Sequence, residues 1–201
     1  DRRHVLAINY IYEIPGLGQR LGNKVLSAVL DKWTLSGITT FSTGAPFTPT
    51  LAWSGTAPDV TGSDSSEAAR VNVVGNPWID PGERTFGRNF KTEAFAAPVP
   101  CSATNQSIAC FGNAGTNIMY GPGFNNWDVT LAKQIPIGLG EKYQLRFRAE
   151  AYNVFNHTQF SSYDTTARFN PSTLALAAPN FGAYSATRPP RTMSFSLRFE
   201  F

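Results

Sequence analysis

The chain has 201 residues, of which 15% are charged and 13% are aromatic, and its formal net charge is +3. Ordinary soluble domains have about 25% charged residues, and the ample apolar content together with the low charge excludes a disordered chain. The basic residues are scattered, which argues against a nucleic-acid partner, and no apolar run approaches the ~20 residues of a transmembrane helix.

Five segments alternate between apolar and polar residues, and we predict that each is a β-strand. Sustained alternation is typical of a strand with one apolar and one polar face. The clearest example is the last segment, in which Met193, Phe195, Leu197, Phe199 and Phe201 alternate with polar residues. The predicted strands span residues 4–14, 33–44, 124–135, 142–155 and 191–201.

The connections between these strands alternate between shorter and long. Two of them, about 46–123 and 156–190, are much longer than the structureless loops of compact soluble domains. Outer-membrane barrels have short periplasmic turns and long extracellular loops, and only helices and closed barrels span a bilayer. We therefore predict an all-β fold, the wall of an antiparallel up-and-down transmembrane β-barrel. A soluble extracellular β-sandwich is the alternative, because its strands also alternate.

Five strands are too few to close a barrel, since the smallest bacterial barrels have about eight. We therefore expect residues 1–201 to be a C-terminal fragment of a larger barrel in the outer membrane of a Gram-negative bacterium. A periplasmic C terminus places both long loops outside the cell. Aromatic residues that we assign to strand ends are expected at the lipid headgroups. They are Tyr10, Tyr12, Trp33, Trp127 and Tyr143.

Four stretches of the sequence resemble the Oar-like TonB-dependent receptors of Acidobacteria. They are residues 33–47, residues 111–117 with 121–128, residues 145–157 and residues 191–201. The resemblance covers the C-terminal part of such a receptor. It implies a ~22-stranded barrel and transport of an unknown solute, driven by the TonB energy-transducing complex through a part N-terminal to this chain.

The last strand is the first candidate functional element. An alternating terminal strand that ends in Phe resembles the signal read by the barrel assembly machinery, and an unpaired strand edge can add to another sheet edge. The alternative is that these side chains only contact outer-membrane lipid. The residues concerned are Phe195, Leu197, Phe199 and Phe201.

Polar side chains on the other faces of the strands form the second candidate group. Asp128, Arg146, Arg148 and Glu150 are expected to face the lumen, where they either line a solute path or form ion pairs that hold the wall. Long exposed loops often carry recognition, so the first long loop, with its aromatic residues, either binds an extracellular ligand or is a lid folded on itself. These residues, with one Asn among them, are Trp53, Asn72, Trp78, Phe86 and Phe95.

Cys101 and Cys110 lie in the same loop, where they form either a disulfide in an oxidising compartment or two free thiols. Together with His4 and His157 they lack the spacing of a zinc site. The sequence contains no nucleophile elbow, phosphate loop or calcium loop, so we expect no catalytic residue, metal or cofactor. The predicted function is TonB-dependent transport, and the alternative within the membrane class is a passive porin-like or adhesive barrel.

Overall fold

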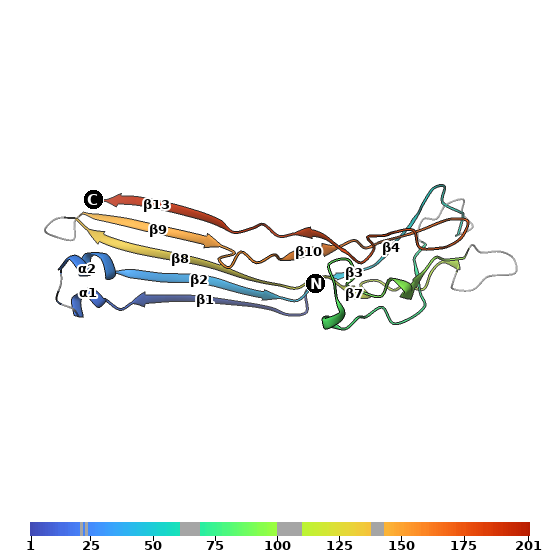
Figure 1. Ribbon diagram of the computed structural model, residues 1–201, viewed down its shortest axis with the longest axis horizontal. Coiled ribbons are helices and arrows are strands. Elements are labelled where there is room, and N and C mark those ends of the chain that lie inside the picture. The colour runs from blue at the N-terminus through green and yellow to red at the C-terminus, as the bar shows by residue number, and fades with distance from the viewer. Residues whose placement is uncertain (21, 23, 61–68, 100–109, 138–142) are drawn as a thin grey trace. The chain divides into compact units, whose positions relative to one another are not determined.

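The computed structural model describes the whole chain except residues 21, 23, 61–68, 100–109 and 138–142 (Figure 1). The chain forms two compact units. The sheet unit comprises residues 4–42, 124–159 and 188–201, and the loop unit comprises residues 1–3, 43–123 and 160–187.

The sheet unit contains one five-stranded antiparallel sheet whose strands follow one another in chain order (Figure 1). The strands are 9 to 13 residues long, against a usual length of about 5–6. This arrangement confirms the predicted antiparallel up-and-down topology. The strands are β1 (Val5–Ile14), β2 (Trp33–Ser42), β8 (Phe124–Pro136), β9 (Gln144–Tyr152) and β13 (Thr192–Glu200).

The pairing register gives the sheet one apolar and one polar face. Tyr10, Gly37, Val129, Ala151 and Met193 lie opposite one another across the five strands, so they share a face. Positions two residues apart along each strand extend this apolar face. Its members include Ile8, Leu35, Leu131, Phe147, Ala149, Phe195, Leu197 and Phe199.

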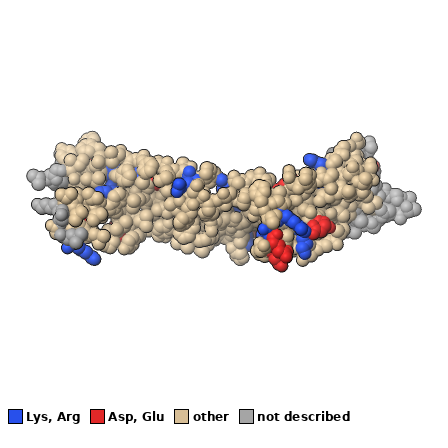
Figure 2. Space-filling view, viewed as in Figure 1, with Lys and Arg blue, Asp and Glu red and all other residues tan. Residues whose placement is uncertain are grey.

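The apolar face is exposed along β13, where the Phe195 and Leu197 side chains are each 64% exposed. In a β-sandwich this face would be buried against a second sheet, whereas the described residues of the sheet unit form one sheet and the other described strands pair as two-stranded sheets in the loop unit. An apolar face this exposed is unlike the inner face of a β-sandwich. Charged side chains are sparse over the sheet on the side that Figure 2 shows.

The connection between β1 and β2 folds into two short helices, α1 (Leu17–Arg20) and α2 (Lys24–Leu30), at the end of the sheet where β13 ends (Figure 1). Asp31 is only 4% exposed, and it accepts hydrogen bonds from the Gly18 amide, at 2.8 Å, and the Ser27 hydroxyl. A Cβ atom at Gly18 would lie 2.2 Å from the Ser27 backbone, so only glycine fits there. Within the described part of the chain, no helix is long and apolar enough to cross a membrane.

The loop unit is built from the two long connections, which start from the other end of the sheet. Its strands are short, because most of its backbone follows irregular turns. Parallel pairing of β4 with β11 joins the two connections directly. The other pairs are antiparallel: β3 with β7, β5 with β6 and β10 with β12. The elements are β3 (Pro46–Phe47), β4 (Thr50–Trp53), β5 (Asn72–Val73), η1 (Pro81–Glu83), η2 (Thr92–Ala94), β6 (Phe95–Ala96), β7 (Met119–Tyr120), β10 (Phe160–Tyr163), β11 (Thr166–Phe169) and β12 (Tyr184–Thr187).

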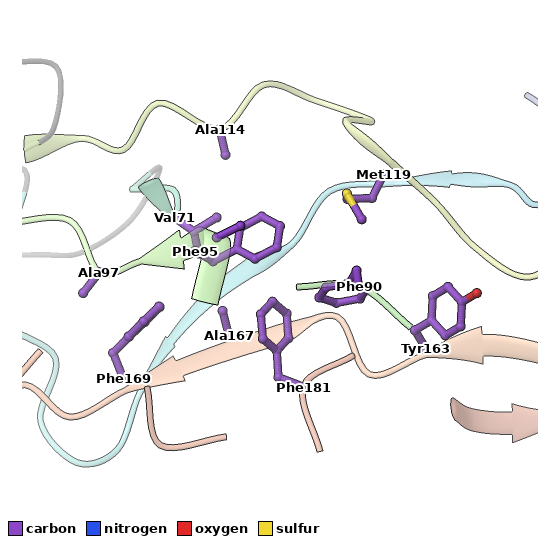
Figure 3. Close-up of a cluster of buried hydrophobic side chains, with 11 residues drawn as sticks. Val71, Phe90, Phe95, Ala97, Ala114, Met119, Tyr163, Ala167, Phe169 and Phe181 are labelled. Carbon is purple, nitrogen blue, oxygen red and sulfur yellow. The ribbon is translucent and has the colours of Figure 1, made fainter. Parts of the chain in front are cut away.

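Both connections contribute side chains to a hydrophobic core in the loop unit (Figure 3). Phe90 is 1% exposed, and its ring centroid lies 5.0 Å from that of Phe181 and 5.8 Å from that of Phe95. Trp53 packs on Phe169 with a centroid separation of 6.4 Å. The two long loops therefore pack against each other, whereas the sequence left open a first loop that folds on itself or one that binds a ligand. Ligand binding by this loop stays a prediction.

Tyr163 belongs to this core, and its ionisation predicts how the loop unit responds to alkali. Burial, with the Tyr184 hydroxyl beside it, raises the pKa of Tyr163 to about 12 from an ordinary 10.0. A raised pKa means that the folded state holds the proton more tightly. The contribution of protonated Tyr163 to the stability of the loop unit is therefore fully present below pH 10 and is lost as the pH rises toward 12. We expect Tyr163→Phe to abolish this part of the alkaline unfolding, measured by intrinsic fluorescence against pH. An unchanged alkaline transition in that variant would contradict the assignment.

Candidate functional site on the polar face

The polar face contains a hydrogen-bonded cluster at the end of the sheet from which the long connections start. Asp128 in β8 accepts hydrogen bonds at its Oδ1 atom from the Asn126 side chain, at 2.8 Å, and from the Asn153 backbone amide, at 2.9 Å. The Val154 amide donates to the Trp127 carbonyl at 2.9 Å. These bonds continue the pairing between β8 and the chain just after β9 ends.

Two asparagines turn the chain after β9. Asn153 and Asn156 adopt left-handed backbone conformations, with φ of 53° and 50°, which asparagine tolerates better than most residues. This turn explains why β9 ends at Tyr152 instead of continuing to 155. The Asn156 side chain accepts a hydrogen bond from the Arg191 amide at 3.0 Å, which ties the turn to the segment that enters β13. The His157 ring lies 2.6 Å from the Asn125 side-chain oxygen.

A cavity of about 540 Å³ lies beside this cluster, and the described residues that line it belong to the sheet unit. Thr40, Asp128 and Tyr152 contribute from three strands of the sheet. Gln159 and Arg188 close it from the segments that flank the sheet, held together by a 2.7 Å hydrogen bond from the Arg188 amide to the Gln159 carbonyl. This volume is within the ~300–1,000 Å³ of small-molecule sites.

The Arg188 guanidinium is fixed above an aromatic ring. Its carbon lies 3.7 Å from the centroid of Phe124, which is a cation–π geometry. The cluster and the cavity together offer hydrogen-bond donors, acceptors and the aromatic rings of Phe124 and Tyr152, which suits noncovalent recognition of a polar molecule.

Farther along the polar face, arginine and glutamate side chains form ion pairs. Arg146 lies 3.3 Å from Glu200, and Arg148 pairs with Glu150 within its own strand. Arg198 lies 3.7 Å from Glu200. These side chains are partly exposed, so each pair contributes roughly 0–1 kcal/mol. The four residues predicted to face the lumen thus share the polar face, but Asp128 belongs to the hydrogen-bonded cluster and not to the ion pairs.

The chain matches the family model of the outer membrane beta barrel domain over residues 1–194. The chain belongs to the outer membrane beta barrel domain family. No curated protein and no solved structure matches it. The family assignment confirms the predicted barrel class and the location in the outer membrane of Gram-negative bacteria. Among the described residues the sheet of this barrel domain is not closed, and β1 and β13 form its edges.

The apolar face of the barrel domain carries aromatic side chains at both ends. At the end where β13 terminates, the Tyr143 ring stacks on Phe199 with centroids 6.1 Å apart, and Phe199 stacks on Phe201 at 6.0 Å. At the other end Trp127 packs against Phe41 at 6.0 Å and Phe155 at 5.6 Å. Two such groups are typical of the aromatic girdles of outer-membrane barrels.

Tyr10 does not lie at a strand end, so the expectation that it sits at the lipid headgroups is wrong. It lies in the middle of β1, opposite Gly37 in β2. A Cβ atom at Gly37 would lie 2.6 Å from the Tyr10 hydroxyl, so the ring covers the space that glycine leaves open. The role of Tyr10 is therefore packing across the strand pair.

The structure places the predicted residues of the last strand and one of the two cysteines. Phe195, Leu197 and Phe199 lie on the apolar face of β13, and Phe201, which follows the strand, is 88% exposed. Cys110 is buried in the loop unit, whereas Cys101 lies outside the described residues, so their pairing stays a prediction. Within the described part of the chain, no group of three or more His, Cys, Asp or Glu side chains could hold a metal ion.

Sequence reasoning missed the residues that enclose the cavity. Gln159 and Arg188 come from the segments beyond the strands, and their alignment depends on pairing between distant parts of the chain. The only available signal was the repeated asparagine at 153 and 156, which indicates a turn with left-handed residues.

Proposed function

We propose that this barrel domain is part of an energy-dependent, TonB-coupled transporter that moves a solute across the outer membrane. The polar face with its cavity is the observation that carries the proposal, because a barrel that passes a solute needs polar groups along its bore. The resemblance of four sequence stretches to Oar-like TonB-dependent receptors supports the coupling to TonB. The solute is bound and passed unchanged, so the proposed role is not enzymatic.

The proposal assigns partners to the two faces of the sheet. The apolar face contacts outer-membrane lipid, with its aromatic groups at the two headgroup levels. The polar face looks into the bore, where the ion pairs of Arg146 and Arg148 hold the wall. The loop unit then lies on the extracellular side.

The test of energy coupling is uptake by cells that express the full-length protein. We expect accumulation of its solute to stop when a protonophore collapses the inner-membrane gradient or when the TonB protein is deleted. Uptake that continues unchanged under both treatments would support the passive porin-like alternative, which the polar face also suits. A matched strain without the gene corrects for uptake through other barrels.

We also propose that β13 carries the signal for the barrel assembly machinery. Its outer edge pairs with no described strand, and its apolar side chains are exposed. We expect Phe201→Glu to reduce the amount of inserted barrel several-fold, because a charge replaces an apolar ring at the end of this strand. Heat-modifiable migration of the protein from outer-membrane fractions measures the inserted amount. Phe201→Leu is the matched control, and normal insertion of Phe201→Glu would overturn the proposal.

A further inference from the structure

Two buried acceptors beside the cavity lack donors within the described part of the chain. Asn153 and Gln159 line the cavity and are each only 7% exposed. The Asn153 Oδ1 and Gln159 Oε1 atoms receive no hydrogen bond from the described residues. A buried acceptor without a donor costs about 1–3 kcal/mol. A solute that fits this cavity should therefore bring hydrogen-bond donors.

The charges around the cavity disfavour a charged solute. Asp128 and Arg188 are the charged residues among its described lining, and their signs are opposite. Asp128 already accepts hydrogen bonds from Asn126 and Asn153, and the Arg188 guanidinium lies over Phe124. Burying an additional charge without a partner would be costly. An uncharged solute avoids that cost.

The cavity also offers groups that recognise hydroxyls and rings. The Thr40 and Thr192 hydroxyls can each donate and accept a hydrogen bond. Tyr152 lines the same space and is 47% exposed, so its ring offers a flat apolar surface. A saccharide matches these requirements. It carries uncharged hydroxyl donors around a ring, and one face of that ring is apolar.

We propose that this cavity binds an uncharged saccharide. The inference rests on the proposed function, since it names the class of solute that the barrel transports. The saccharide hydroxyls donate to Gln159 and Asn153, while one face of its ring packs on Tyr152. This assignment concerns binding, so it can be tested apart from the energy coupling.

The test uses the full-length protein in a detergent without a sugar headgroup, because glycosidic detergents would compete for the site. Calorimetry measures binding of glucose, galactose, maltose and cellobiose, with glucuronate as the charged comparison. We expect at least one neutral sugar to bind and glucuronate to bind more weakly.

Gln159→Leu separates a binding role from a structural one. Leucine keeps most of the side-chain volume but removes a buried acceptor that lacks a donor, so we expect thermal stability to be maintained or raised. Saccharide binding should weaken at least about tenfold. Tyr152→Ala should weaken it similarly, whereas Tyr152→Phe should retain it. Ser196→Ala, on the same polar face but outside the cavity lining, is the matched control and should bind as the parent does.

Two outcomes would overturn the inference: no neutral sugar binds the parent protein, or the Gln159→Leu and Tyr152→Ala variants both bind as tightly as the parent. If saccharide binding depends on Gln159 but a protonophore does not affect uptake, the proposed energy coupling is contradicted and the saccharide inference is retained. If the protein takes up a charged solute in an energy-dependent way and Gln159→Leu does not affect this uptake, the saccharide inference is contradicted and the energy coupling is retained.

Discussion

Asp128→Ala is expected to destabilise the sheet unit by about 3 kcal/mol. The Asp128 carboxylate accepts one hydrogen bond from the Asn126 side chain and one from the Asn153 backbone amide. Hydrogen bonds to charged groups contribute about 1.5–3 kcal/mol each, and the partly buried Asn153 amide would be left without its acceptor. Because Asn153 starts the left-handed turn after β9, we expect loosening to concentrate at residues 153–157.

Urea unfolding of the full-length protein in lipid vesicles measures the loss, with heat-modifiable migration as the readout. Glu150→Ala is the matched control. Glu150 lies on the same face, and its ion-pair partner among the described residues is the partly exposed Arg148, a pair worth roughly 0–1 kcal/mol. Asp128→Asn keeps one acceptor oxygen and should lose less than alanine does. A loss no greater than that of Glu150→Ala would show that the cluster does not hold the end of β9.

The alternation of the sequence was sufficient to predict the sheet and its two faces. Side chains in a strand alternate strictly, so Phe195 and Leu197 on one face and Ser194 and Ser196 on the other follow from position alone. The pattern also indicated the order of the strands, because an up-and-down sheet pairs each strand with its neighbours along the chain. Local patterning therefore carried most of the information about the sheet unit.

The loop unit could not be predicted in this way. Its strands have two to four residues, which is too short for a period to be recognised. Its parallel pairing of Leu51 with Ala167 joins parts of the chain that are far apart in sequence. The cavity depends on similar long-range pairing, since Gln159 and Arg188 meet only when the turn after β9 and the entry to β13 are both in place.

Lys133 shows where alternation is misleading, because a lysine occupies a position of the apolar face. It lies opposite Trp33 in β2 and Phe147 in β9, yet it is only 6% exposed. Its Nζ atom donates to the Val29 carbonyl at 2.9 Å and to the Asp31 carbonyl at 2.8 Å, and it lies 4.8 Å from the centroid of the Trp33 ring. The side chain thus runs along apolar surface and places its charge at the end of α2.

Lys133→Met is expected to destabilise the helical connection by about 2 kcal/mol. Methionine fills a similar volume but removes both hydrogen bonds from the charged Nζ atom, while the Val29 carbonyl keeps its 2.9 Å hydrogen bond from the Trp33 indole. We expect the loss of the two charge-assisted bonds to outweigh the gain from removing one buried charge. The change should be local, appearing as faster hydrogen exchange and protease cleavage within residues 17–30 while the strands stay protected. Gln134→Met is the matched control, because Gln134 is the next residue of β8 and is exposed. Its hydrogen bond to the described part of the connection comes from its backbone amide, which the substitution keeps. Equal or greater protection of residues 17–30 in Lys133→Met would contradict this expectation. The free-energy cost of burying the lysine would then exceed the stabilisation from its two hydrogen bonds. The fold of the connection would depend instead on the hydrogen bonds that Asp31 accepts.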